Sequence, residues 1–529
     1  MPSLRPLAAV LGLVAAACAA PSSATSDDDL TSVTGRARKL ELGGTVYVEE
    51  GAADDAILAV VRAQTQTAFG PLRTSQIAVN SRELKGVDPA TFVKRVVDVV
   101  DTDAEGAPSK KMLEVRYTYR DDAVVSAELA SRSQIPLALL GPDYKAQAKR
   151  IIKECTADDA HAREFEASAW YVFEPRLPGC QEAMRAEQAK IEADRGKLTD
   201  KGRQVTKSDA TRLYLPIQVQ LGADTTNQAA SYPDYARLFR GGVQKDKLVV
   251  GLVQGFIDDD QDGARPAVSD YNWGELMTTL GELMDAQGDF ALVAPPPAVP
   301  ANLVADLRSF KLPSGKMVDG ASFADLVRVH RGGSRLALEE KDRADLEKQF
   351  ADRLSRKWIA LERPVRVRIG DEAERDFAIQ VLVYFGADVI SGPHKLATKN
   401  SDVFLYNGHS SIGYGPLDPK YFTPADFAQD SYQLFWIDSC VSYNYYEKDY
   451  FPLKQGGSKD LDLITNGVEA PSYRSGHAMG QFLIALLGGQ ASYRELLLAA
   501  KDTESLRVVD GELDNTFRPE ATPVRISPR

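Results

Sequence analysis

Basic clusters, long apolar runs and cysteines are all scarce in this chain of 529 residues. Lys and Arg number 63 against 75 Asp and Glu, which gives a net charge of -12. No basic run carries interleaved aromatics that could follow a phosphate backbone, so nucleic acid is not expected as a partner. After the first 18 residues, no apolar stretch is long enough for a membrane-spanning helix. The chain is too long for one hydrophobic core, so we expect two or three domains.

The N-terminus has the pattern of a secretory signal peptide. Arg5 precedes the apolar residues 7–14, and small residues follow up to Cys18. Residues 15–18 (Ala-Ala-Ala-Cys) resemble a bacterial lipobox, in which the Cys becomes the lipidated first residue of the mature protein. The alternative is cleavage near Ala20 or Ala24 without lipidation. Both alternatives predict an exported bacterial protein, either attached to the cell envelope only by its lipid or released outside the cell.

The rest of the chain divides into four segments. We predict a flexible tether at 19–39, an N-terminal mixed α/β domain at 40–205, a middle region at 206–361 and a C-terminal domain at 362–529. The middle region has strand patterns at residues 213–221 and 248–253. It also contains an acidic loop and the stiff Pro-rich connector 295–300.

The C-terminal segment alternates short apolar stretches with helical patterns. Predicted strands cover residues 365–369, 402–406, 433–437 and 461–465, and predicted helices cover 371–385 and 477–487. This alternation predicts an α/β fold with a mostly parallel sheet flanked by helices. In such a sheet, reactive side chains collect in the loops that leave the carboxyl ends of the strands.

The four cysteines can be given different roles. Cys155 and Cys180 lie close enough in sequence to close a local disulfide loop in an oxidising compartment. The alternative is that they are two separately buried thiols. If Cys18 is lipidated or removed, Cys440 is left over, and an odd thiol in an exported protein is a candidate reactive group.

Two loops of the C-terminal segment carry a chemically suitable pair. Residues 407–411 (Asn-Gly-His-Ser-Ser) directly follow one predicted strand, and residues 438–442 (Asp-Ser-Cys-Val-Ser) directly follow the next. A Cys thiol with a pKa near ~8.5 is only partly ionised at neutral pH, and the imidazole of His409 could raise the thiolate fraction of Cys440. Backbone N–H groups of Gly408 and Ser410 could stabilise an oxyanion.

These two loops and their flanks, residues 363–498, resemble the group of cysteine peptidases that includes caspases, gingipains, clostripain and legumain. The resemblance implies a caspase-like fold with His409 as general acid/base and Cys440 as nucleophile. It implies a protein or peptide substrate and no required cofactor. Typical members have Gly directly after the His, where this chain has Ser410. The alternative is an inactive surface lipoprotein of the same fold that acts as a binding or scaffold protein.

Residues that follow the next predicted strand are candidates for a substrate pocket. Glu469 would favour a basic side chain before the scissile bond, whereas Arg474 would favour an acidic one, and Tyr473 lies between them. His477 follows Cys440 in the order of papain-like enzymes. However, those enzymes place the Cys at the start of a long helix, whereas Cys440 follows a strand, so we interpret His477 as a first-turn helix residue.

An acidic loop in the middle region has the spacing of a calcium site. Asp258, Asp260 and Asp262 precede Gly263, and this D-x-D-x-D-G pattern can direct three carboxylates at one Ca²⁺. Ser269 stands at the twelfth position, where an EF-hand has its closing acid. The alternative is a solvated acidic turn.

Overall fold

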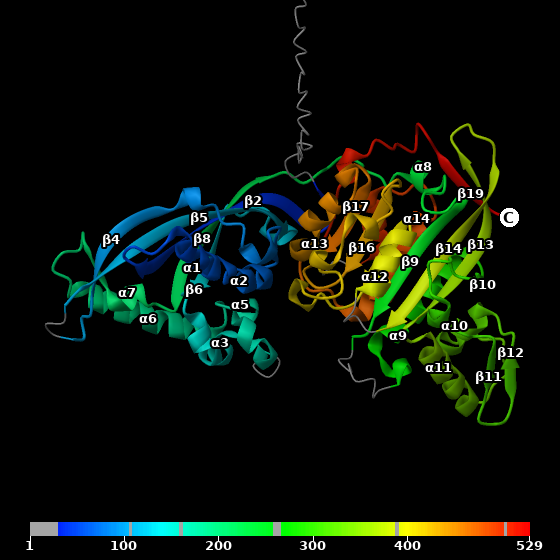
Figure 1. Cartoon of the computed structure of the whole chain (residues 1–529), viewed down its shortest axis with the longest axis horizontal. Coiled ribbons are helices and arrows are strands. Elements are labelled where there is room, and N and C mark those ends of the chain that lie inside the picture. Colours follow the sequence, from blue (N-terminus) through cyan, green and yellow to red (C-terminus); the bar gives the residue numbers. More distant parts are fainter. Residues whose placement is uncertain (1–29, 105–107, 158–161, 258–265, 387–390, 502–504) are drawn as a thin grey trace, which may run out of the picture.

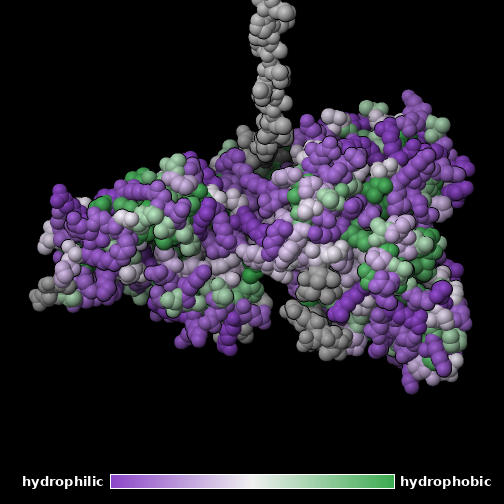
Figure 2. Space-filling view, in the orientation of Figure 1, coloured by the Kyte–Doolittle hydropathy of each residue, from purple (hydrophilic) through white to green (hydrophobic). Residues whose placement is uncertain are grey.

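The computed structural model describes residues 30–104, 108–157, 162–257, 266–386, 391–501 and 505–529. They form a smaller domain, residues 35–224, and a larger domain that contains the remaining described residues. The two domains lie side by side, each around its own sheet, and the mixed α/β class predicted from the sequence is confirmed (Figure 1). Within these residues, no helix is both long and apolar enough to cross a bilayer. The face in Figure 2 is mainly hydrophilic over both domains, with small hydrophobic areas.

The smaller domain contains a seven-stranded, mainly antiparallel sheet in the order β6-β8-β2-β5-β4-β7, with β3 also paired to β5. Its strands are β2 (Gly35–Glu49), β3 (Ile77–Val79), β4 (Val93–Val100), β5 (Lys110–Ser126), β6 (Gln134–Leu140), β7 (Gln204–Thr206) and β8 (Tyr214–Asp224). Its helices are α1 (Asp54–Gln66), α2 (Phe69–Thr74), α3 (Ala148–Cys155), α5 (Ala169–Val172), α6 (Pro178–Gly196) and α7 (Lys207–Ala210).

The predicted disulfide joins two helices of this domain. Cys155 at the end of α3 is bonded to Cys180 in the first turn of α6. Both cysteines are fully buried. The two cysteines are 25 residues apart in sequence, and their bond therefore fixes the end of α3 to the start of α6.

The larger domain contains a ten-stranded sheet in the order β1-β18-β17-β16-β15-β9-β14-β13-β10, with β19 also paired to β13. Its strands are β1 (Thr31–Ser32), β9 (Lys247–Gly255), β10 (Ala291–Val293), β13 (Lys357–Ile369), β14 (Arg375–Gly386), β15 (Val403–Asn407), β16 (Gln433–Asp438), β17 (Leu461–Asn466), β18 (Arg507–Asp510) and β19 (Val524–Pro528). The pairings among β14, β9, β15, β16 and β17 are parallel, and the others are antiparallel. The sheet is therefore mixed around a parallel centre, instead of mostly parallel as predicted.

Helices cover both faces of this sheet. They are α8 (Tyr235–Leu238), α9 (Tyr271–Gln287), α10 (Phe323–Arg331), α11 (Glu340–Leu354), α12 (Gly392–Asn400), α13 (Ser442–Tyr450), α14 (Ser475–Leu486) and α15 (Tyr493–Ala500). The hairpin β11 (Ser309–Lys311) and β12 (Met317–Asp319) lies beside α10 and α11 (Figure 1). Residues that alternate along β15 and β16 pack with α9 and α14 on one face and with α12 and α13 on the other. The second of these clusters continues into the smaller domain.

The domain limits differ from those expected from sequence. β8 belongs to the sheet of the smaller domain, whereas we placed this segment in the middle region. β9, from the same predicted region, lies at the centre of the larger sheet between β14 and β15. Residues 30–39 were expected in the tether, but β1 pairs with β18 and β2 begins at Gly35. The smaller domain is therefore inserted between two strands of the larger sheet.

The prediction of a helix at residues 371–385 is wrong, because most of this segment forms strand β14. Ile379, Val381 and Val383 pack on one face of the sheet, while Leu382 and Tyr384 pack on the other. A strand covered on both faces is apolar at successive positions, so it lacks the alternation that identifies a half-buried strand.

Candidate functional site

His409 and Cys440 lie in neighbouring loops at one edge of the larger sheet. β15 and β16 are parallel neighbours, and their last residues, Asn407 and Asp438, are paired in register. Each loop residue lies two positions beyond its paired strand residue. The Gly408 N–H donates to the Asp438 carbonyl oxygen at 3.4 Å, so the two loops leave the sheet side by side. The two loops are therefore neighbours, as predicted.

The His409 ring contacts the loop that follows β9. Its Nε2 lies 3.0 Å from the carbonyl oxygen of Ile257. A carbonyl only accepts hydrogen bonds, so Nε2 is the donor, and Nδ1 is the basic nitrogen of the neutral ring. The Tyr406 hydroxyl donates to the His409 carbonyl oxygen at 3.0 Å. The ring is therefore held by the loop after β9, and the backbone of His409 is held by β15.

The backbone at both loops is strained. Val441, directly after Cys440, has φ 54° and ψ 32° and precedes the first turn of α13. In the other loop, Ser411 and Ile412 have φ 48° and 53°. For β-branched residues this left-handed region costs about 1–3 kcal/mol, and such strain is concentrated at functional sites. It places Cys440 at a sharp turn from strand to helix.

The Cys440 side chain is half-buried and packs beside the apolar cluster that the two domains share. Burial raises the pKa of its thiol above the ordinary value. The Ala470 N–H, which donates to this thiol, and the guanidinium of Arg73 oppose the shift, whereas the carboxylate of Asp438 adds to it. In this arrangement Cys440 is therefore a thiol at neutral pH, and a base must take its proton before it can react.

The two loop residues predicted as oxyanion donors, Gly408 and Ser410, differ in the hydrogen bonds that they already make. The Gly408 N–H is already bonded to the Asp438 carbonyl oxygen. Ser410 is buried, and its carbonyl oxygen accepts hydrogen bonds from the Gly413 and Gly415 N–H groups and from the Tyr446 hydroxyl. These bonds stabilise the shape of the His409 loop, and Gly408 would have to exchange its partner to serve an oxyanion.

A buried ion pair lies beneath the Cys440 loop. Asp438 Oδ1 is 3.0 Å from Arg507 Nη2, and both side chains are almost completely buried. Asn466 Nδ2 donates to the same Oδ1 at 2.7 Å, and its own Oδ1 accepts from Arg507 Nε at 3.1 Å. The Arg507 guanidinium lies 4.4 Å from the Trp436 ring centroid. Asp438, Asn466 and Arg507 thus join three adjacent strands directly below the candidate nucleophile.

The smaller domain contacts the loop that follows β15 and the helix that follows β16. Arg82 donates to the Gly413 carbonyl oxygen and pairs with Asp418 at 3.1 Å, both of which follow His409. The Phe69 ring stacks on Tyr445 of α13, with 6.1 Å between ring centroids. These contacts lie beyond the carboxyl ends of β15 and β16, and Figure 1 shows α13 on the side that faces the smaller domain.

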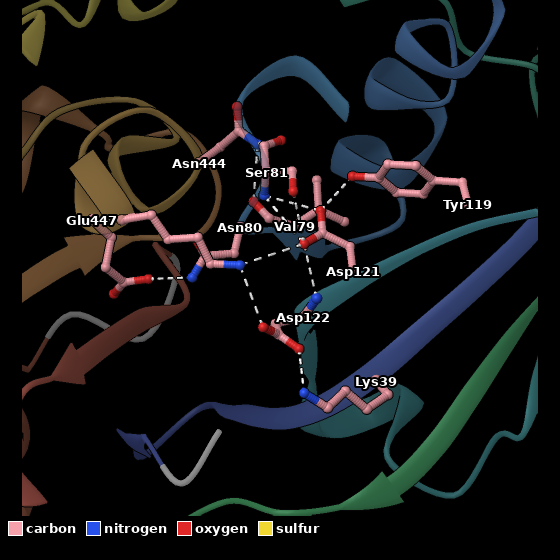
Figure 3. Close-up of polar contacts among 10 residues, drawn as sticks. Lys39, Val79, Asn80, Ser81, Tyr119, Asp121, Asp122, Asn444 and Glu447 are labelled. Carbon is pink, nitrogen blue, oxygen red and sulfur yellow. Dashed lines mark hydrogen bonds and ion pairs between the residues drawn. The ribbon is translucent and has the colours of Figure 1, made fainter. Parts of the chain in front are cut away.

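Asn444 of α13 is the polar centre of the contact between the domains (Figure 3). Its Nδ2 donates to the carbonyl oxygens of Val79 at 2.9 Å and Ser81 at 2.8 Å, and its Oδ1 accepts from the Glu83 N–H at 3.1 Å. Beside it, Asn80 donates to Glu447 at 2.7 Å. Burial raises the pKa of the Glu447 carboxyl well above its ordinary value.

We expect Asn444→Ala to loosen the smaller domain from α13. The change removes three hydrogen bonds and leaves buried backbone groups without partners, at a cost of about 2–3 kcal/mol. Amide hydrogen exchange in residues 77–84 should become at least tenfold faster. Asn400→Ala is the matched control, since Asn400 donates to Leu396 within its own helix. Unchanged exchange in the Asn444 variant would contradict this role.

The predicted pocket residues lie beyond the next strand, β17. Glu469 pairs with Arg73 of the smaller domain. Tyr473 is exposed, and the Arg474 guanidinium lies 5.2 Å from its ring centroid. His477, in the first turn of α14, is 2.8 Å from Glu282 Oε1 of α9, which agrees with its interpretation as a helix residue.

The remaining predicted sites fall largely outside the described residues. Cys18 and the acidic residues Asp258, Asp260 and Asp262 are not among them. Among the residues that are described, no group of three or more His, Cys, Asp or Glu side chains could hold a metal ion.

Arg73, Asn444 and Arg507 were missed by sequence reasoning. Each acts through partners far away in the chain, and none belongs to a local motif.

Comparison with known proteins found no relative of this chain. No family model matches the sequence, and no curated protein and no solved structure is significantly similar to it.

Proposed function

We propose that the chain is an exported cysteine peptidase that cleaves peptide bonds with His409 and Cys440. The observation that carries this proposal is the placement of the two residues. They occupy equivalent positions in the loops after two parallel, register-paired strands, and both loops have strained backbone. Reactive groups in open α/β sheets collect at this edge. The resemblance of these loops to caspase-like peptidases supports the same assignment.

The reaction would follow the chemistry of a Cys nucleophile with a His base. His409 would take the thiol proton of Cys440, and the sulfur would attack the peptide carbonyl carbon to form a tetrahedral intermediate. The C–N bond would then break as His409 returns the proton to the leaving amine, which leaves an acyl-enzyme. Water, deprotonated by the same imidazole, would release the new carboxyl terminus and regenerate the thiol.

Export by the N-terminal signal, with or without a lipid on Cys18, belongs to the same proposal. The Cys155–Cys180 disulfide supports it, because such bonds persist in oxidising compartments. A Ca²⁺ ion held by Asp258, Asp260 and Asp262 also remains a proposal.

A second candidate is an inactive scaffold of the same architecture. Burial raises the pKa of the Cys440 thiol, and the smaller domain contacts the loops on both sides of it. A protein that needs only the shape of the domain would keep these contacts without chemistry.

The decisive experiment combines peptide cleavage with alkylation of Cys440. We expect the full chain to cleave a mixed peptide library and Cys440→Ala to reduce cleavage at least about 10³-fold, because the nucleophile is removed. His409→Ala should slow iodoacetamide alkylation of Cys440, followed by peptide mass spectrometry, at least tenfold. His477→Ala is the matched control and should leave both rates unchanged, since its ring is held by Glu282. Equal, slow alkylation with and without His409 and no cleavage would support the scaffold.

A further inference from the structure

Arg73 of the smaller domain reaches the edge of the sheet where the candidate nucleophile lies. It belongs to α2, and its Nη1 pairs with Glu469 Oε1 in the loop after β17. Its Nη2 donates to the Tyr171 carbonyl oxygen at 3.1 Å, and its guanidinium lies 4.6 Å from the Tyr171 ring centroid. The Arg73 side chain is only 14% exposed, whereas Glu469 is 44% exposed. A guanidinium is thus enclosed between a carboxylate, a carbonyl oxygen and an aromatic face.

The enclosure lies directly beside Cys440. Ala470, the residue after Glu469, donates its N–H to the Cys440 thiol, and the Arg73 charge acts on the same sulfur. The Cys440 thiol also acts electrostatically on Tyr171, whose carbonyl oxygen and ring contact Arg73. A side chain bound here would belong to the residue next to the bond that Cys440 attacks.

Arg73 leaves one of its polar groups unsatisfied in this position. Its Nε is buried and has no hydrogen-bond partner among the described residues. A buried donor without a partner destabilises the arrangement that holds it. An ion pair with the half-exposed Glu469 returns little stability, because solvent screens it. The contact is therefore a weak one, kept in place by the rest of the domain interface, and a ligand can replace it.

We propose that Glu469 is the subsite for a basic side chain of the substrate, and that Arg73 occupies this subsite from within the chain and competes there with the substrate. The inference rests on the proposed peptidase function for its substrate, and it assigns the substrate class as peptides with Arg or Lys before the scissile bond. It also resolves the choice between Glu469 and Arg474, because Glu469 already binds a guanidinium while the Arg474 guanidinium lies on the exposed Tyr473 ring.

The internal arginine has an advantage over a free ligand. Held by the domain interface, Arg73 is present at an effective concentration in the millimolar range or above. A peptide at micromolar concentration competes poorly with it. Displacement of the smaller domain, or loss of this one side chain, would open the subsite.

The test uses the full chain and alkylation of Cys440 by iodoacetamide, with benzamidine as a probe for the subsite. We expect Arg73→Ala to be alkylated at Cys440 at least tenfold faster than the wild type, because the vacated subsite outweighs the loss of a charge that lowers the pKa of the thiol. Benzamidine at millimolar concentration should return this rate toward the wild-type value, because its amidinium would pair with Glu469 as Arg73 did. In Arg73→Ala/Glu469→Gln the rate should stay high and benzamidine should have no effect.

Arg82→Ala is the matched control, since it removes another arginine of the same interface that pairs with Asp418 instead of Glu469. Its alkylation should show no response to benzamidine. An Arg73→Ala protein alkylated at the wild-type rate, or protected equally by benzamidine without the Glu469 carboxylate, would overturn the inference.

Peptide cleavage separates this inference from the proposed function. Arg73→Ala should cleave peptides with Arg before the scissile bond at least tenfold faster than peptides with Glu there. Benzamidine protection without any cleavage would reject the peptidase function and keep the cation subsite. Cleavage without preference for a basic residue would keep the peptidase and reject the subsite.

Discussion

Arg507→Ala is expected to destabilise the larger domain by about 3–5 kcal/mol, because it leaves the Asp438 carboxylate buried without its counter-charge. Asp438 and Arg507 are 3.0 Å apart and almost completely buried. The change also removes the hydrogen bond to Asn466 and the contact with the Trp436 ring. Since Asp438 ends the strand that leads to Cys440, we also expect faster amide exchange in residues 438–442.

Urea unfolding, followed by tryptophan fluorescence, would measure this effect. The double variant Asp438→Asn/Arg507→Met should regain a large part of the lost stability, because neither charge then remains buried alone. Arg366→Ala is the matched control, as its pair with Glu374 in the same domain is half-exposed. It should cost less than about 1 kcal/mol. A similar loss in the Arg366 and Arg507 variants would refute the role of the buried pair.

Asp462→Asn is expected to be more stable than the wild type at pH 8, and this advantage should be smaller at pH 5. Burial raises the pKa of the Asp462 carboxyl to about 7, although the Tyr432 and Tyr493 hydroxyls and the Asn515 amide donate to it and lower the pKa. The pKa of the folded state is thus above that of the unfolded chain. The protonated carboxyl favours folding below pH 4, and this contribution is lost as the pH rises through about 7. At one pKa unit per about 1.4 kcal/mol, the loss amounts to about 4 kcal/mol.

The free energy of unfolding at pH 5 and pH 8 would test this linkage. The wild type should lose more stability between these values than Asp462→Asn, in which no charge has to be buried. Part of the dependence should remain in the variant, because burial also raises the pKa of Asp402 to about 7 and of Asp510 to about 6. Asp376→Asn is the control at an exposed position of β14. Identical pH dependence in Asp462→Asn and the wild type would show that the Asp462 carboxyl does not cause this loss of stability.

The candidate dyad could be located from sequence because its signals are local. β15 and β16 are short apolar strands, each followed at once by small and polar residues, and both were predicted within one residue of their observed ends. The parallel pairing of the two strands then follows from the general architecture of α/β sheets. The Cys155–Cys180 bond was also predictable, since few cysteines are available and these two are near each other in sequence.

Other features depend on residues that are distant in the chain. The segment of β14 has apolar side chains at successive positions, which suit a helix or a strand buried on both faces, and only its pairing with β9 and β13 selects the strand. Trp358 continues the four-residue spacing of Leu346, Phe350 and Leu354 but lies in β13, after α11 has ended. Periodicity alone cannot show where α11 ends and β13 begins.

The sequence by itself determined the class of the fold, the disulfide and the loops that carry His409 and Cys440, because each is encoded by spacing within a short segment. Only the tertiary structure decided what surrounds Cys440. Arg73 meets Glu469, Asn444 meets Val79 and Ser81, and Arg507 meets Asp438 through pairs that lie far apart in the chain. Such partners are chosen by packing, charge and burial in the folded chain, and no local pattern of residues specifies them.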